Sequence, residues 1–134
     1  MRNMMTWSKP EGYGKSKIDW SGRILKDNSS PEKDMNEAIN ILNNWRAIHS
    51  YPLHIFQMTL KNASKKYDKN SLTAQRLKRV TSIINKLNRR YEGRSPSMQL
   101  SQMQDIAGCR TIVKDVEIAK RIYEGEFLYG WRKN

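Results

Sequence analysis

The sequence predicts an α+β fold in which N-terminal helices pack on the start of a mixed β-sheet. Apolar residues recur at helical spacing between positions 35 and 63, which is typical of amphipathic helices that bury one face. A run rich in β-branched residues then occupies positions 106–113, as expected for a strand. Helical spacing comes first and the strand pattern second, which favours separate helical and sheet regions.

The first 30 residues are rich in glycine, serine, lysine and asparagine, and they predict an irregular N-terminal arm. Within this arm, Ile18–Leu25 is the one stretch expected to form a short helix. Residues 31–134 are expected to form one domain, because a chain of 134 residues supports a single modest core.

The motif Ser30-Pro31-Glu32 predicts the start of the first long helix, with serine as N-cap, proline in the first turn and an acid beside it. Tyr51-Pro52 is expected to end this helix, because proline disfavours helical geometry at the residue before it. Large apolar residues of the helix, such as Trp45, are expected in the core.

Pro52 is also expected to begin a second helix, which should end within residues 65–70. Four apolar residues of this helix share one face at helical spacing and are expected to be buried. They are Leu53, Phe56, Leu60 and Ala63.

Two interpretations fit Leu72–Tyr91. As a single helix, the segment would carry an apolar stripe opposite a basic face. As a strand followed by a helix, it would place Arg76 and Lys78 on one strand face, with Thr81 or Ser82 capping the helix. We favour the second interpretation, because a helix N-terminus beside several cations is a good site for phosphate.

The remaining elements follow from short signals. Ile106–Val113 is expected to be a buried strand, and Gly108 within it predicts a close backbone approach or a bulge. Asp115 is expected to cap a short helix, Val116–Tyr123. The tail over 125–134 holds several aromatic and apolar residues, so we expect it to pack.

The charge balance points to polyanionic partners. The net charge is +12, and residues 76–94 hold seven basic side chains against one acid. The single cysteine excludes a disulfide framework within one chain. The sequence has no apolar signal core and no apolar run of membrane-spanning length, so the expected location is cytoplasmic, with no membrane partner.

Six residues in the basic segment and beside the predicted strand carry the chemistry that a nucleotide site requires. They are Arg76, Lys78, Ser82, Lys86, Asp105 and Arg110. Lysines suit phosphate groups, serine suits a phosphate oxygen or a helix cap, and aspartate is a hard oxygen ligand for Mg²⁺. Arginine grips phosphate or stacks on a base. The set therefore predicts a site for a nucleoside triphosphate with Mg²⁺.

Two motifs also resemble a known family. The pattern R-x-K-x-x-x-S-I-x-x-K begins at Arg76, and D-x-x-G-x-R begins at Asp105. Both are similar to motifs of the RelA/SpoT-type (p)ppGpp synthetases, at about the same separation. The pattern W-R-x-x-H-x-Y-P-L from Trp45 looks most like the stand-alone small alarmone synthetases, including the toxic ones. The resemblance spans roughly residues 13–115 and implies a nucleotidyltransferase-like fold.

The resemblance also implies roles. The two arginines would sandwich the adenine of ATP, while the two lysines and Ser82 would hold its phosphates. Asp105 would bind the catalytic Mg²⁺. Family members transfer the β,γ-pyrophosphate of ATP to the ribose 3′-hydroxyl of GDP or GTP in the stringent response, as GTP pyrophosphokinases. In some toxic members the acceptor is tRNA.

The family pattern continues with a tyrosine-bearing loop and an E-x-Q-x-R segment that serve the acceptor, and this sequence has neither. The chain is therefore expected to supply the ATP and Mg²⁺ half of an incomplete synthetase domain and not to turn over alone. Because toxic members occur in toxin–antitoxin pairs, an antitoxin or self-association is a further expected partnership.

Two other classes of function fit the sequence. One is a basic nucleic-acid-binding module without catalysis, in which Arg76–Arg94 follows phosphates and binding weakens with salt. The other is a regulatory fragment that pairs with a synthetase or an antitoxin, for which the aromatic tail is the supporting feature.

Overall fold

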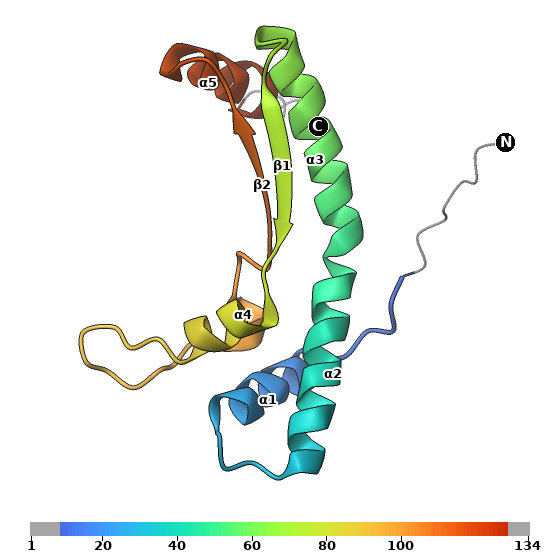
Figure 1. Ribbon diagram of the computed structural model, residues 1–134, viewed down its shortest axis with the longest axis vertical. Helices are drawn as coiled ribbons and strands as arrows, with labels where there is room; N and C mark the ends of the chain where they lie inside the picture. The colour runs from blue at the N-terminus through green and yellow to red at the C-terminus, as the bar shows by residue number, and fades with distance from the viewer. Residues whose placement is uncertain (1–8, 129–134) are drawn as a thin grey trace, which may run out of the picture. The chain divides into compact units, whose positions relative to one another are not determined.

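The structure is a computed structural model that describes residues 9–128 (Figure 1). Within this range the chain is mixed α and β, so the α+β class is confirmed. The elements in chain order are α1 (Lys15–Lys26), α2 (Glu32–Ile48), α3 (Ser50–Tyr67), β1 (Leu72–Leu77), α4 (Val80–Leu87), the 3₁₀ turn η1 (Leu100–Gln102), β2 (Ala107–Ile112), α5 (Val116–Ile122) and the π-helical turn η2 (Tyr123–Leu128). Of the mixed sheet that the sequence predicts, the described residues contain one pair of strands.

The chain forms two compact units. Unit 1 combines Met1–Tyr51 with Leu77–Ala107, and unit 2 combines Pro52–Arg76 with Gly108–Asn134. Unit 1 holds the main apolar core, built by α1, α2, α4 and the residues around η1. Its buried members are Ile18, Leu25, Ala38, Ile41, Leu42, Ile83, Leu87, Leu100, Met103 and Ile106.

The short helix expected over Ile18–Leu25 is confirmed as α1, which extends a few residues further at its N-terminal end and one at its C-terminal end. Ile18 and Leu25 lie seven residues apart on one helix face and are almost fully buried, so this face joins the core of unit 1. Gly22 lies between them, and a Cβ atom there would approach the Leu100 side chain to 3.0 Å. A glycine thus permits close packing of α1 on η1. Residues 1–8 of the expected arm lie outside the described residues.

The two long helices form as predicted, with differences at their ends and in their burial. Pro31 rather than Ser30 is the N-cap of α2, and α3 begins at Ser50 after a single intervening residue. In α3, Leu53 and Ala63 are buried, whereas Phe56 is 58% exposed. The prediction that Phe56 belongs to the core is therefore wrong, because helical spacing alone does not show how wide a face becomes covered.

The interpretation of residues 72–91 as a strand followed by a helix is confirmed, and the single-helix alternative is wrong. The helix α4 begins at Val80, and its N-cap is Arg79 without a side-chain hydrogen bond. The prediction of a Thr81 or Ser82 cap is thus also wrong. Ile83 and Leu87 occupy one face of α4 and are buried, which ties this short helix to the core of unit 1.

The strands β1 and β2 run antiparallel beside each other (Figure 1). The hydroxyl oxygens of Thr73 and Thr111 are 3.3 Å apart across the pair. On the same face of the pair, the Cys109 thiol donates to the Leu53 carbonyl oxygen of α3 at 3.6 Å. Burial along β2 alternates between half-buried and exposed residues. The expectation of a buried strand is therefore wrong, because only one face of the pair is covered.

The glycine of β2 also differs from its prediction. Gly108 is exposed, and no atom lies within 4 Å of the position that a Cβ would take. The predicted close backbone approach is therefore absent among the described residues, and the alternative prediction, a bulge, is not tested by this observation.

The helix α5 forms as predicted. Asp115 is its N-cap, and its side chain accepts a hydrogen bond from the Ile118 backbone N–H at 2.9 Å. The first part of the expected packed tail follows in η2, where Glu126 pairs with Lys66 of α3 at 3.1 Å. Residues 129–134 of that tail lie outside the described residues. None of the helices within residues 9–128 has the length and apolar character needed to cross a membrane.

Candidate functional site

A carboxylate held by two ammonium groups lies in unit 1. The Lys78 Nζ donates to Oδ2 of Asp105 at 2.8 Å, and the Lys86 Nζ donates to Oδ1 at 2.8 Å. We call these three residues the Asp105 cluster. Each carboxylate oxygen therefore has its own charge-assisted hydrogen bond, and the cluster carries a net charge of +1.

Local structure explains why Asp105 meets Lys86 and Lys78, which precede it in the sequence by 19 and 27 positions. Lys78 directly follows β1, and its backbone N–H donates to the Ile106 carbonyl oxygen at 2.7 Å, which places it beside the residue after Asp105. The helix α4 begins two residues later and carries Lys86 in its second turn. Because Ile83 anchors α4 in the core, Lys86 is held where its ammonium group reaches the carboxylate.

Burial within the cluster is uneven. The side chain of Lys78 is 10% exposed and that of Lys86 is 20% exposed, whereas the side chain of Asp105 is 47% exposed. The two ammonium groups lower the pKa of Asp105 to about 2, with the hydrogen bond from Lys78 as the largest cause and that from Lys86 next. Asp105 is therefore ionised at neutral pH, and its side chain remains half-exposed.

We expect an NMR titration of the Asp105 carboxyl carbon to have its midpoint near pH 2 rather than at the ordinary value of 3.8. The folded-state pKa is depressed, so the contacts contribute stability above about pH 4 and lose it as the pH falls towards 2. Solvent reaches the half-exposed side chain, so this effect on stability is expected to be small. A midpoint at the ordinary value would contradict the two lysine contacts.

Ser82 belongs to the same unit but not to the cluster. It lies in the first turn of α4, half-buried, and within the described residues its hydroxyl makes no hydrogen bond to another protein group. Four residues separate it from both Lys78 and Lys86 in sequence. Its hydroxyl is thus a donor without a protein acceptor in the described part of unit 1.

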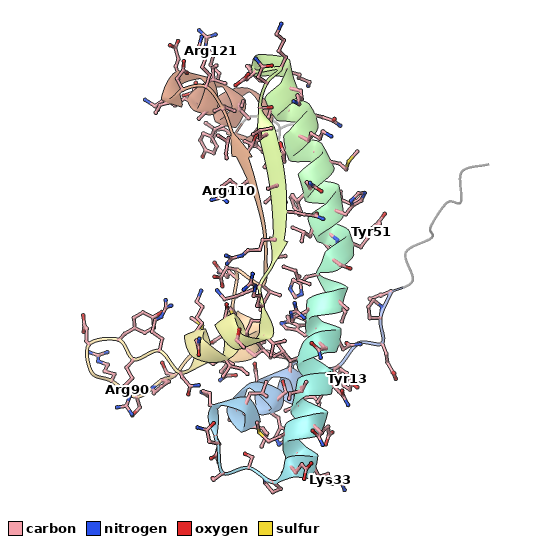
Figure 2. All side chains as sticks on the ribbon, in the orientation of Figure 1. Tyr13, Lys33, Tyr51, Arg90, Arg110 and Arg121 are labelled. Atoms are coloured by element: carbon pink, nitrogen blue, oxygen red, sulfur yellow. The ribbon has the colours of Figure 1, made fainter. Side chains whose placement is uncertain are left out.

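Arg76 and Arg110 belong to unit 2, where both are exposed. The contact between Thr73 and Thr111 implies a register in which Arg76 faces Gly108. Arg110 then lies on the same face as Arg76, diagonally across the strand pair, where side chains are about 7 Å apart at their Cβ atoms. Figure 2 shows the Arg110 side chain extending away from the strands.

Sequence analysis missed a residue that supports the cluster. The Arg46 Nε of α2 donates to the Lys78 carbonyl oxygen at 2.9 Å. The Lys78 carbonyl oxygen lies between β1 and α4 and takes part in the hydrogen bonding of neither element, so the bond from Arg46 gives it a partner. The available signal was the position of Arg46 four residues after the buried Leu42, on the covered side of the predicted helix.

Replacing Arg46 with methionine is expected to lower the free energy of unfolding of unit 1 by about 1–3 kcal/mol, because the Lys78 carbonyl loses its partner. The Asp105 pKa should rise toward its ordinary value, since Lys78 is then less firmly placed. Urea denaturation and the carboxyl titration measure the two effects. Arg23→Met, at an exposed position of α1, is the matched control and should change neither value. An unchanged Asp105 pKa in Arg46→Met would contradict this positioning role.

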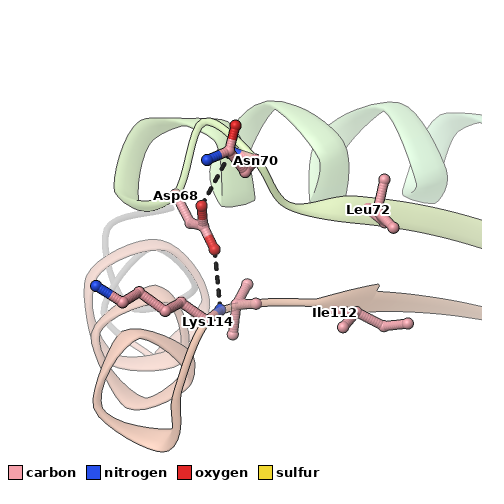
Figure 3. A pocket seen from close by; sticks show the side chains of 6 residues that line it. Asp68, Asn70, Leu72, Ile112 and Lys114 are labelled. Atoms are coloured by element: carbon pink, nitrogen blue, oxygen red, sulfur yellow. Dashed lines mark hydrogen bonds between the residues drawn. The ribbon is translucent and has the colours of Figure 1, made fainter.

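Unit 2 contains an open cavity of about 270 Å³ at the end of the strand pair (Figure 3). It is lined by Asp68, Asn70, Leu72, Ile112, Val113 and Lys114. The Asp68 carboxylate already accepts hydrogen bonds from the backbone N–H groups of Asn70 and Lys114, at 2.9 Å each. Its charge therefore holds the loop after α3 to the end of β2. None of the six predicted site residues lines this cavity.

Asp105 offers one half-exposed carboxylate to a metal ion, but a metal would need further ligands. Among residues 9–128 there is no group of three or more histidine, cysteine, aspartate or glutamate side chains able to hold a metal. A site with one carboxylate suits Mg²⁺ that arrives with a polyphosphate, since Mg²⁺ keeps waters and takes phosphate oxygens as ligands. No protein-family model matches this chain, and no curated protein matches it.

Proposed function

We propose that this chain binds Mg²⁺·ATP as the donor half of a RelA/SpoT-type pyrophosphate transferase with a nucleotidyltransferase-like fold. The observation that carries the proposal is the Asp105 cluster. One ionised, half-exposed carboxylate is held by two lysines with little exposure of their own. These three residues are members of the two motifs that resemble the family.

The cluster suits an exchange of partners when a triphosphate binds. Phosphate oxygens would compete with the Asp105 carboxylate for the ammonium groups of Lys78 and Lys86, and Asp105 would then be the residue that holds the metal. The bound Mg²⁺ would neutralise phosphate charge during transfer. In this exchange the lysines change acceptors without moving far, because their stems are largely buried and the backbone of Lys78 is held at both its N–H and its carbonyl.

The remaining predicted residues have chemistry that suits a nucleotide, each within its own unit. The Ser82 hydroxyl is a spare donor in the first turn of α4, four residues from each lysine in sequence. The two guanidinium groups of unit 2, on Arg76 and Arg110, share one face of the strand pair. Two planar cations on one face suit stacking on the two sides of one base.

The proposed reaction joins the 3′-oxygen of an acceptor ribose to the β-phosphorus of ATP. The bond between that phosphorus and the oxygen bridging to the α-phosphate breaks, and AMP leaves. The proton of the acceptor hydroxyl passes to a base that the six residues do not supply. Their part is to bind the donor and to stabilise the charge that develops on its phosphates. The acceptor is GDP, GTP or the 3′ end of tRNA.

Calorimetry with ATP, in the presence and absence of Mg²⁺, tests the donor site directly. We expect binding that requires Mg²⁺. A parallel assay offers γ-labelled ATP with GDP, GTP or tRNA and separates the products by chromatography. Binding without transfer would identify a donor half-site, and label on one acceptor would show that this chain suffices and name the acceptor. Absence of Mg²⁺-dependent ATP binding would refute the proposal.

A further inference from the structure

A basic loop of unit 1 takes no part in the Asp105 cluster. It follows α4 and contains Arg89, Arg90, Tyr91 and Arg94, all of which are exposed. Figure 2 shows Arg90 on this loop, which projects beyond the end of α4. We call residues 89–94 the arginine turn.

The arginine turn has a defined backbone. Glu92 and Gly93 both have positive φ angles, of 53° and 73°, and the Arg94 N–H donates to the Tyr91 carbonyl oxygen at 3.0 Å. Two consecutive residues with positive φ angles, between the two residues that such a hydrogen bond joins, are typical of a type I′ turn, which reverses the chain tightly. The backbones of Tyr91 and Arg94 are therefore neighbours at the two ends of the turn.

The cations of the turn have no acidic partner. Within the described residues, none of the three arginines takes part in an ion pair or a side-chain hydrogen bond. Lys78 and Lys86, from the same basic segment, are instead both occupied by Asp105. The turn thus offers three guanidinium groups without an ion pair to an external polyanion, and Tyr91 beside them in the sequence is 54% exposed.

We infer that the arginine turn binds single-stranded nucleic acid, with the arginines on its phosphates and Tyr91 stacked on an unpaired base. Arginine and an exposed aromatic ring together are the groups that bind single strands without reading their sequence. The faces of the bases are covered in a duplex, so the exposed Tyr91 ring is expected to stack on the bases of a single-stranded nucleic acid and not on those of a duplex. This inference does not depend on ATP binding by the Asp105 cluster.

Fluorescence anisotropy tests the inference with a labelled 12-nucleotide oligo(U), its DNA counterpart and an RNA duplex, each over a salt series. We expect both single strands to bind more tightly than the duplex. Changing Arg89, Arg90 and Arg94 together to glutamine should reduce the slope of log K against log salt by about 2, from three phosphate contacts. Tyr91→Ala should weaken binding by about tenfold, whereas Tyr91→Phe should not.

The control variant removes the same charge at three other exposed sites, Arg23, Lys33 and Lys61, by changing each to glutamine. An equal loss of affinity in this control would mean that net charge alone attracts the strand and would overturn the inference. Equal affinity for the duplex, or for anionic lipid vesicles, would do the same. Displacement of the oligonucleotide by ATP at constant free Mg²⁺ would mean that the oligonucleotide binds at the Asp105 cluster, and would contradict a site on the arginine turn. Retention of the strand under saturating ATP supports a separate site.

Discussion

Replacing Asp105 with asparagine is expected to abolish detectable Mg²⁺·ATP binding, with a loss of about 100-fold or more in affinity. The substitution removes the carboxylate proposed as the ligand of Mg²⁺. It keeps an oxygen that accepts from Lys78, so unit 1 should remain folded. Calorimetry at fixed free Mg²⁺ measures the affinity, and circular dichroism checks the fold.

The matched control is Glu37→Gln. Glu37 is also a carboxylate of unit 1, 45% exposed and paired with a lysine, Lys17, at 2.8 Å. The control therefore removes the same charge and the same kind of ion pair at a site outside the cluster. Its affinity for Mg²⁺·ATP should equal that of the unchanged protein. Wild-type affinity in Asp105→Asn, or an equal loss in Glu37→Gln, would contradict the proposed donor site.

Replacing Ile83 with alanine is expected to lower the free energy of unfolding of unit 1 by about 2–5 kcal/mol. Ile83 is fully buried and joins α4 to the core, so a smaller residue leaves a cavity under the helix that carries Lys86. Urea denaturation followed by tryptophan fluorescence measures the change, because Trp20 and Trp45 pack against this core.

Ile112→Ala makes the same chemical change where the side chain is 59% exposed. It should cost less than about 1 kcal/mol, since little apolar area returns to water. Similar losses in the two variants would mean that α4 is not held by its buried face. A destabilised Ile83→Ala protein should also bind Mg²⁺·ATP less well at temperatures where unit 1 begins to unfold.

Local signals in the sequence were enough to predict most of the elements. The preferred interpretation of residues 72–91 as a strand followed by a helix agrees with β1 and α4, and Asp115 identified the start of α5. The arm was predicted in part: the short helix over Ile18–Leu25 was expected, but the polar composition of the arm did not show that Ile18 and Leu25 join the core. Composition averages over a segment, whereas a helix needs only one apolar face to join a core.

The candidate site was likewise predicted in part. Residue type and spacing selected Lys78, Lys86 and Asp105 as candidate residues for a triphosphate and its metal, because charge and ligand preference belong to the side chains themselves, and the three side chains do meet in the structure. Spacing did not show that both lysines contact the same carboxylate. It also missed Arg46, whose partner is a backbone carbonyl 32 residues away. Every residue has a backbone carbonyl, so the type of the accepting residue gives no signal in the sequence for such a hydrogen bond.

The sequence by itself thus determined the class of fold, the order of the elements after residue 30 and the chemistry available near Asp105. These depend on the spacing of apolar residues and on side-chain type, which act over a few neighbouring positions. The tertiary structure alone decided that Phe56 is exposed, that α1 joins the core and that the cluster leaves its carboxylate half-exposed between two nearly buried lysines. Those outcomes depend on which faces cover one another, and burial is shared among residues that are distant in sequence.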